Sequence, residues 1–506
     1  MAFYDVIEGV AIIPEGESEI CMNAFDHCTD LTSVTIPDSV TLINLSAFRG
    51  CTGLKSITIP DSVTEIEWGA FSGCTGLTSV TMGKSVTEID WSAFEGCSGL
   101  ASITIPASVT EIDSSAFEGC TGLTNIVVAE GNKVYDSRDN CNAIIETENN
   151  LLIIGCKNTV IPDSVTGINS DAFLGCTSLT SITIPDSVTK IGSGAFKGCT
   201  GLTSIVVAEG NKIYDSRDNC NAIIETHYNM LLIGCKTTVI PASVTEIGYE
   251  AFKGCTGLTS ITIPASVTSI RDDAFTGCLG LTSIVVEEGN KKYDSRNNCN
   301  AIIETVKNRL VIGFSASVIP ASVTEIGYGA FAGCNLTSIT IPDSVTEIGE
   351  IAFSGCTGLT SIVIPNSVTT IKSGTFHRCQ VTSVAIPNSV TEIEGDAFIY
   401  SGLTSITIPE SVKNIGCQAF SSCEGLKSVS ILAPVNKLIN TFSSCQGLET
   451  VTLGAGIKKI DYAFYDCPAL KVINVPAKKA DYYKKRLPEE LHPLIVELPP
   501  VKKAKK

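Results

Sequence analysis

Residues 54–76 read LKSITIPDSVTEIEWGAFSGCTG, and residues 77–99 read LTSVTMGKSVTEIDWSAFEGCSG, so the second stretch repeats the pattern of the first after 23 residues. Phe71 in the first stretch belongs to a series of sixteen phenylalanines that begins at Phe25 and ends at Phe464. Self-similarity at a period of about 20 to 50 residues is typical of a solenoid, in which each repeat is one coil stacked on the last. We therefore expect one repeating core and a function that resides on its surface.

Each coil contains two short extended runs. Residues 54–59 favour a strand, and Pro60 then turns the chain because proline fixes φ and has no N–H to donate to a sheet. Residues 63–66 form a second extended run, and the glycines of residues 73–76 bend the chain back. β-branched residues and glycine disfavour helix throughout. The offsets of leucine and isoleucine are those of leucine-rich repeats, so we predict a leucine-rich repeat solenoid of about sixteen β coils of 22–23 residues with little helix.

Three insertions interrupt the period. The gap from Phe117 to Phe173 is 56 residues instead of 23, and a gap of the same length occurs twice more. The sequence Tyr-Asp-Ser-Arg at 135–138 returns at 214 and 293, followed each time by two apolar runs about a polar turn. This pattern predicts a β-hairpin. The predicted hairpin insertions span about residues 129–160, 208–239 and 287–318.

Both ends of the chain depart from the repeat and are expected to cap it. Residues 1–30 hold a degenerate capping coil, with Phe3, Tyr4, Val6 and Ile7 available to cover the first repeat. The solenoid is expected over residues 31–476. Residues 477–506 form a basic C-terminal cap and tail, in which we expect a helix over 477–487, a strand near 494–498 and a disordered end over 499–506.

The charge of the chain constrains its partners. The formal net charge is −18, although the 30 residues from 477 onward hold nine basic and four acidic groups. Nucleic acid is therefore a poor partner for the solenoid, since phosphate binding needs a basic stripe. The basic end either touches an anionic surface or only keeps the end of the chain soluble.

The 22 cysteines are mostly arranged in one column. Fifteen stand three residues after the phenylalanine, from Cys28 to Cys467, and Ser401 takes the sixteenth place. Equivalent Cβ atoms in successive coils should lie about 4.8 Å apart with parallel bonds, whereas a disulfide needs about 3.8 Å. We expect buried free thiols in this column.

Two cysteine pairs in the insertions are better disulfide candidates. They are Cys141/Cys156 and Cys220/Cys235. The third insertion has Cys299 opposite Phe314, which argues for a buried apolar site instead. The oxidation state of these two pairs stays open.

Signatures of catalysis are nearly absent. The sequence has no phosphate loop, nucleophile elbow, paired-cysteine zinc spacing or usual calcium loop. His27 beside Cys28 in principle activates a thiolate, but Cys28 belongs to the structural column. Asp136, Asp139, Asn140 and Asn142 are candidates for binding a cation, although such residues more often cap backbone N–H groups in turns. We predict no enzymatic activity, no cofactor and no metal.

One surface column is distinctive. The outward positions of the first strand are a uniform lattice of serine and threonine, which lacks the aromatic and arginine anchors of protein interfaces. The column two residues after the isoleucine of the second strand holds both tryptophans of the protein. The candidate partner-binding residues are Leu45, Trp68, Trp91, Tyr249 and Tyr328. The alternative is that these side chains only lie flat over the edge of the coil.

The repeated phrase Leu-Thr-Ser-Ile-Thr-Ile-Pro-Asp-Ser-Val-Thr-Glu-Ile-Gly, followed by Ala-Phe and Gly-Cys-Thr-Gly, is nearly complete at 258–277 and 336–358. It resembles the BspA-like leucine-rich repeat family, and the match runs from about residue 10 to 475. The resemblance implies surface or secreted proteins of host-associated bacteria and some protists that adhere to host proteins or other cells. It implies no residue-level binding site, because the motif is the core itself.

Targeting signals are not evident. Residues 1–20 carry five acidic residues and no basic one, unlike a secretory signal peptide, and no stretch is long enough to span a membrane. From the repeat and the family resemblance, we nevertheless expect a non-enzymatic, adhesin-like solenoid for protein or cell-surface recognition. The resemblance implies a location at the cell surface or secretion. The alternative is a cytoplasmic scaffold of the same fold.

Overall fold

The computed structural model describes residues 4–499. The chain divides into two compact units, Met1–Gly257 and Leu258–Lys506, and each is a stack of β coils. Strands of successive coils pair in parallel with a register of one repeat, so that Ser56 lies opposite Ser79 and Ile57 opposite Val80. The predicted solenoid with little helix is confirmed.

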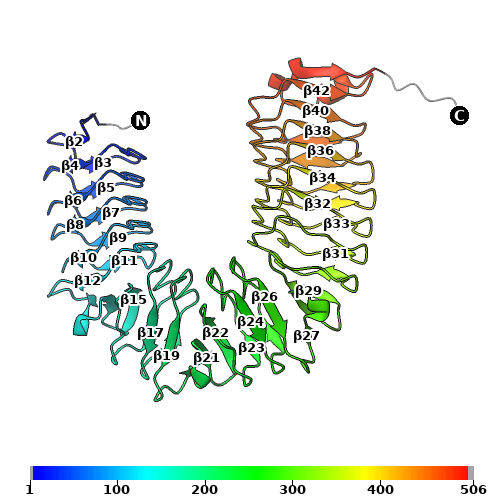
Figure 1. The fold of residues 1–506 in the computed structure, drawn as a ribbon. Helices are drawn as coiled ribbons and strands as arrows, with labels where there is room; N and C mark the ends of the chain where they lie inside the picture. Colours follow the sequence, from blue (N-terminus) through cyan, green and yellow to red (C-terminus); the bar gives the residue numbers. More distant parts are fainter. Residues whose placement is uncertain (1–3, 500–506) are drawn as a thin grey trace. The chain divides into compact units, whose positions relative to one another are not determined.

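In unit 1 the first strands of successive coils form one column, visible at the blue end of Figure 1. In most of these strands serine and threonine face solvent while the apolar residue between them faces the core, as in β6, because successive side chains of a strand point to opposite faces. The strands of this column are β2 (Val10–Ile12), β4 (Ser33–Thr35), β6 (Ser56–Thr58), β8 (Ser79–Thr81), β10 (Ser102–Ile105), β12 (Asn125–Val128), β17 (Ser181–Ile184) and β19 (Ser204–Val207).

The second strands of unit 1 form another column after the proline turn. Each is only two residues long, with its isoleucine toward the core in most coils. They are β3 (Glu19–Ile20), β5 (Leu42–Ile43), β7 (Glu65–Ile66), β9 (Glu88–Ile89), β11 (Glu111–Ile112), β16 (Gly167–Ile168), β18 (Lys190–Ile191) and β23 (Glu246–Ile247).

The insertions contain the predicted hairpins and one strand more. In the first, β14 pairs antiparallel with β15, β13 pairs antiparallel with β14, and β15 then pairs in parallel with β16. The insertion thus joins the second-strand column. The elements are β13 (Tyr135–Asp136), η1 (Arg138–Asn140), β14 (Ala143–Glu146) and β15 (Leu151–Gly155); β20 (Tyr214–Asp215), η2 (Arg217–Asn219), β21 (Ala222–Glu225) and β22 (Met230–Gly234); β27 (Tyr293–Asp294), η3 (Arg296–Asn298), β28 (Ile302–Glu304) and β29 (Arg309–Ile312).

Unit 2 is built from two strand columns of the same kind. Its first strands are β24 (Ser260–Ile263), β26 (Ser283–Val286), β32 (Ser361–Val363), β34 (Ser383–Ala385), β36 (Ser405–Ile408), β38 (Ser428–Ile431), β40 (Thr450–Leu453), β42 (Val472–Val475) and β43 (Ile495–Glu497). Its second strands are β25 (Ser269–Ile270), β30 (Glu325–Ile326), β31 (Glu347–Ile348), β33 (Thr370–Ile371), β35 (Glu392–Ile393), β37 (Asn414–Ile415), β39 (Lys437–Ile439) and β41 (Lys459–Asp461).

The described residues form about 21 turns rather than about sixteen. The difference arises because phenylalanine does not mark every coil. Each insertion is a coil that begins with an ordinary first strand, β12, β19 or β26, and lacks the Ala-Phe corner. The last two first-column strands, β42 and β43, also have no phenylalanine after them.

The N-terminal end of unit 1 is covered by the chain before the first coil. β1 (Val6–Ile7) pairs antiparallel with β2, and the ring of Tyr4 stacks on Phe25 with centroids 5.5 Å apart. Phe3 lies outside the described residues.

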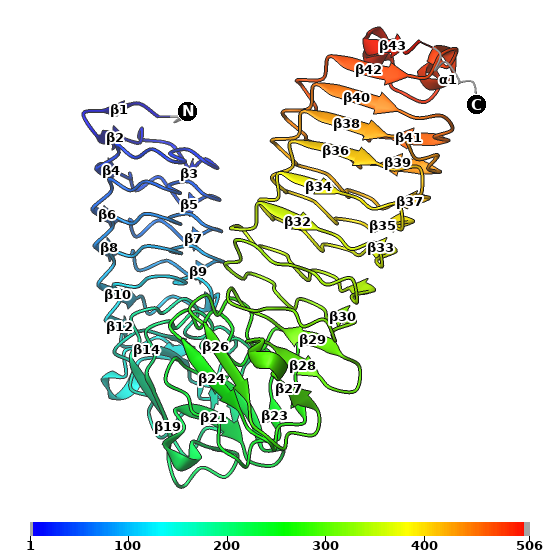
Figure 2. The ribbon, with the colours of Figure 1, turned by 45° about the vertical axis from the view of Figure 1, so that its right-hand side comes forward.

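The C-terminal end of unit 2 is covered by helical turns. Helix α1 (Ala480–Lys484) is shorter than the predicted 477–487, and η4 (Glu489–Leu494) follows it. Figure 2 shows α1 beside β43 at the red end. Tyr483 is fully buried and its hydroxyl donates to the Gly454 carbonyl. Of the tail expected over 499–506, residues 500–506 lie outside the described residues.

The core consists of stacked phenylalanines. The rings of Phe48 and Phe71 have centroids 5.1 Å apart and planes 3° apart, and Phe71 repeats this contact with Phe94. All three rings are fully buried. Since neighbouring coils of this stack place their rings at the same point, burial of a ring in one coil is completed only by the next coil, so a single repeat cannot bury its own core.

The cysteine column forms a second ladder inside the same corner. The thiol of Cys74 donates to the Phe48 carbonyl at 3.0 Å, and the thiol of Cys97 donates to the Phe71 carbonyl at 3.2 Å. All 22 cysteines are free thiols, those of the insertions included. Burial raises the pKa of Cys120 to about 12, so this thiol stays protonated and inert at neutral pH.

Candidate functional site

The candidate column forms a continuous stripe in the first four coils of unit 1. We call Met22, Leu45, Trp68 and Trp91 the N-terminal stripe; each stands three residues before the phenylalanine of its coil. Backbone hydrogen bonds join the stripe from coil to coil, since the N–H of Ser46 donates to the Trp68 carbonyl at 3.0 Å and that of Gly69 to the Trp91 carbonyl at 2.9 Å. The stripe is therefore carried on a rigid backbone.

The side chains of the N-terminal stripe face solvent. Trp68 is 53% exposed, Trp91 62% and Met22 55%, while Leu45 is half-buried. The sequence analysis missed Met22, although the same spacing before Phe25 marks it.

Two carboxylates fix the backbone of the stripe. Glu67 Oε2 accepts the Leu45 N–H at 3.0 Å, and Asp90 Oδ1 accepts the Trp91 N–H at 2.7 Å. These bonds satisfy N–H groups at the corner where the chain leaves the second strand, and charge-assisted bonds of this kind are stronger than neutral ones.

A row of glutamates lies beside the N-terminal stripe. Glu65, Glu88 and Glu111 begin β7, β9 and β11, and the strand register places each directly opposite the next. We call them the glutamate ladder. Burial raises the pKa of Glu88, and the neighbouring charges of Glu111 and Glu65 raise it further. Within residues 4–499, no lysine or arginine forms an ion pair with these three side chains.

Tyr249 and Tyr328 stand apart from the N-terminal stripe. Both are exposed, by 62% and 50%, but each lines a hollow beside an insertion. Tyr249 lines a cavity of about 290 Å³ in unit 1 together with Phe196, Phe252 and Leu232, and Tyr328 lines one of about 40 Å³ in unit 2.

The cavity in unit 1 follows from the missing Ala-Phe corner of the insertion coil. Gly234, at the end of β22, occupies the place of that corner, and a Cβ there would lie 2.1 Å from the ring of Phe252. The first insertion has the same glycine, Gly155, yet its hollow measures only about 20 Å³. Leu232 and Ile233 of the second insertion are partly exposed, whereas the equivalent Ile153 and Ile154 are buried.

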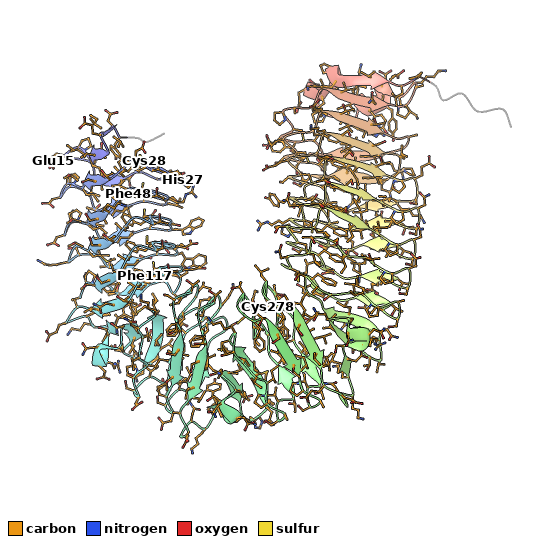
Figure 3. The ribbon with its side chains drawn as sticks, viewed as in Figure 1. Glu15, His27, Cys28, Phe48, Phe117 and Cys278 are labelled. Carbon is orange, nitrogen blue, oxygen red and sulfur yellow. The ribbon has the colours of Figure 1, made fainter. Side chains whose placement is uncertain are left out.

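His27 and Cys28 lie together at the N-terminal end of unit 1 (Figure 3). Burial raises the pKa of the Cys28 thiol, and the neighbouring Cys51 raises it further, which is the reverse of what a catalytic thiolate needs. The His27 ring packs on the next coil, where a Cβ at Gly50 would lie 2.2 Å from His27 Nδ1. The surroundings of His27 and Cys28 therefore suit a structural role in the packing of the coils.

The aspartate that begins the turn of each insertion is engaged by arginine. Arg138 Nε donates to Asp136 Oδ1 at 2.8 Å and its Nη2 donates to Oδ2 at 2.7 Å. Its Nη1 donates to Asn150 at 2.7 Å. The other two insertions repeat this pair as Arg217 with Asp215 and Arg296 with Asp294. In the described part of the chain, no three His, Cys, Asp or Glu side chains gather in a way that could hold a metal ion.

Most of the chain matches one protein family. The family described as "BspA type Leucine rich repeat region (6 copies)" matches residues 18–143, 153–229, 227–307, 312–403 and 391–486. No relative is found among curated proteins. Within residues 4–499, no helix has the length and apolar character needed to cross a bilayer.

Several solved structures are similar to this chain. A leucine rich cell surface protein from Faecalibacterium prausnitzii is 25% identical over 85% of this chain and 89% of that one, with a TM-score of 0.37. A leucine-rich repeat protein from Bacteroides ovatus is 24% identical over 83% and 86%, with a TM-score of 0.32. The pneumococcal vaccine antigen PcpA is 20% identical over 85% and 90%, with a TM-score of 0.33.

The family match covers well over half of the chain, and the matched residues include the repeating coils with their stacked Ala-Phe corners. This chain belongs to the BspA-type leucine-rich repeat family.

Proposed function

We propose that this protein recognises a protein partner without catalysis, as an adhesin-like solenoid whose contact surface includes the N-terminal stripe. The observation that supports this proposal is the pair of tryptophans in adjacent coils, each more than half exposed. Tryptophan is the residue most enriched among the side chains that dominate binding energy. A monomeric protein rarely exposes neighbouring large apolar side chains without a use for them.

The rigidity of the coil favours the same conclusion. The backbone beneath Trp68 and Trp91 is held by hydrogen bonds to the coils on either side. Binding therefore orders only the side chains, and the entropy cost per residue is low. The contact surface that we propose leaves out Tyr249 and Tyr328, which line hollows beside the second and third insertions.

The family resemblance supports a role for the protein at the cell surface. The test is protease shaving of intact cells followed by detection of the remaining protein. Loss of the protein from intact cells supports the surface role. Protection until the cells are lysed contradicts it and favours the cytoplasmic scaffold.

The binding surface is tested by the double variant Trp68→Ala with Trp91→Ala, scored against the cells or matrix proteins that the wild type binds. Loss of at least one anchor typically weakens binding by about 2 kcal/mol or more. Tyr462→Ala is the matched control, since Tyr462 is 66% exposed and lies in unit 2. Circular dichroism must show that the double variant is folded. Equal binding by the folded double variant and the wild type contradicts the proposal.

A further inference from the structure

Stacked glutamates are neutralised elsewhere in the molecule but not in the glutamate ladder. In unit 2, Glu325 and Glu347 also lie opposite each other in β30 and β31. There, Arg309 Nη1 lies 3.7 Å from Glu325, and Lys372 pairs with Glu347. Like charges placed directly opposite on adjacent strands are destabilising. In unit 2 these two ion pairs offset the repulsion between the glutamates. Within residues 4–499, the three successive carboxylates of the glutamate ladder have no lysine or arginine paired with them.

The surrounding coils offer few bases for compensation. Residues 17–113 contain thirteen acidic residues and three lysines or arginines. Arg49 pairs with Asp26 at 2.7 Å and Lys84 with Asp61 at 3.7 Å, while Lys55 directly precedes β6 in the other strand column. The coils that carry the N-terminal stripe therefore have a strong excess of negative charge.

We infer that the N-terminal stripe and the glutamate ladder together bind a lysine- and arginine-rich segment of another protein, an inference that rests on the proposed function. The ladder supplies carboxylates for ammonium and guanidinium groups. The exposed faces of Trp68 and Trp91 attract cations through the ring quadrupole. The same rings cover the aliphatic stems of lysine and arginine.

The geometry favours a row of cationic side chains over one small cation. Successive carboxylates stand one per coil, about 4.8 Å apart along the backbone, so each meets a separate charge. A calcium ion requires six to eight oxygen atoms within about 2.3–2.6 Å, and no such group of acidic side chains occurs among residues 4–499.

Trp68 and Trp91 are the two tryptophans of the protein, so its tryptophan fluorescence reports on the N-terminal stripe alone. An oligolysine peptide should produce a saturable change in tryptophan emission, and an oligoserine peptide of equal length should not. The apparent affinity for oligolysine should fall steeply with added salt, as expected for exposed charge pairs. Absence of a saturable response at low salt contradicts the inference.

The role of the ladder is tested by the triple variant Glu65→Gln, Glu88→Gln and Glu111→Gln. It should bind oligolysine at least about tenfold more weakly, equivalent to 1.4 kcal/mol. The matched control is Glu130→Gln, Asp163→Asn and Glu209→Gln, which removes the same charge from exposed positions elsewhere in unit 1. An equal loss in both variants would mean that net charge alone attracts the peptide, and the inference would be wrong.

The two proposals fail in different ways. If the tryptophan double variant loses the cellular partner while the glutamine triple variant keeps it, the proposed function stands and the cationic partner is wrong. If both variants keep the cellular partner, the N-terminal stripe is not the binding surface. The triple variant retains the shape of the side chains and should fold at least as well as the wild type, which a melting curve checks.

Discussion

At the residue scale, Glu88 shows how the glutamate ladder lowers the stability of the folded protein. Its pKa is raised by burial and by Glu111 and Glu65, so its ionisation is less favourable in the folded protein than in the unfolded chain. This destabilisation is absent at a pH below the pKa that Glu88 has in the unfolded chain, because the carboxyl is then protonated in both states. It grows as the pH rises through the pKa that Glu88 has in the folded protein, and it reaches its full size at neutral pH.

We therefore expect Glu88→Gln to stabilise the protein at neutral pH. The gain should be about 0.2–1 kcal/mol in the free energy of unfolding, because the charges are partly screened by solvent. The gain should shrink as the pH falls below about 4. Denaturant titrations at the two pH values measure it, and a loss of stability at neutral pH would contradict the account of the ladder.

At the scale of structural elements, a single asparagine holds the turn that leads into each insertion. Asn211 Nδ2 donates to the Pro185 carbonyl at 2.8 Å and to the Val188 carbonyl at 2.9 Å. Its Oδ1 accepts the N–H groups of Ile213 and Tyr214 at 2.9 Å. Asn132 and Asn290 make the same bonds in the other insertions.

Asn211→Asp should destabilise the protein by about 1–3 kcal/mol, because a carboxylate has no hydrogen to donate and leaves two carbonyls without their partner. The free energy of unfolding measures the loss. Asn158→Asp is the matched control, since Asn158 is exposed and the same chemical change should there have little effect. Equal stability of the two variants would mean that the side-chain bonds of Asn211 contribute nothing.

The insertions should not respond to calcium. In each, the carboxylate that begins the turn is held by an arginine two residues later, and a cation would have to displace that guanidinium. The melting temperature should therefore be the same with calcium and with a chelator. A saturable rise with calcium, which would reveal binding to the folded state, would overturn this prediction and point to Asp139 and Asp218 as ligands.

At the scale of the whole molecule, the cysteines report on folding. Of the 22 free thiols, Cys417 is the one classed as exposed among residues 4–499. After unfolding without a reductant, all 22 thiols should react with a thiol reagent. In the native protein, rapid labelling should be dominated by Cys417 and largely abolished by Cys417→Ser. Fewer reactive thiols after unfolding would mean that disulfides form, with the pairs Cys141/Cys156 and Cys220/Cys235 as the first suspects.

Most of the fold could be predicted because every coil carries the same apolar offsets. Leu54, Ile57, Ile66 and Phe71 have only one way to be buried together, and the next coil repeats it. The turn count was underestimated because the insertion coils lack phenylalanine. The third strand of each insertion was missed because a two-residue strand such as β13 leaves no periodicity to detect.

The candidate site was predictable only in part. The spacing before the phenylalanine identified Leu45, Trp68 and Trp91, and the same spacing also marks Met22. The same spacing marks Tyr249 and Tyr328, which in the structure line hollows beside the second and third insertions. Side-chain exposure depends on what neighbouring coils cover, and a linear sequence does not contain that information.

The sequence by itself determined the solenoid, the buried column of thiols and the acidic character of the body, because these follow from residue types at a fixed period. Tertiary structure alone decided that Glu65, Glu88 and Glu111 have no compensating base within residues 4–499, while Glu325 and Glu347 have Arg309 and Lys372. The physical reason is that Coulomb energy depends on distances between coils, and parallel pairing brings residues 23 positions apart into contact.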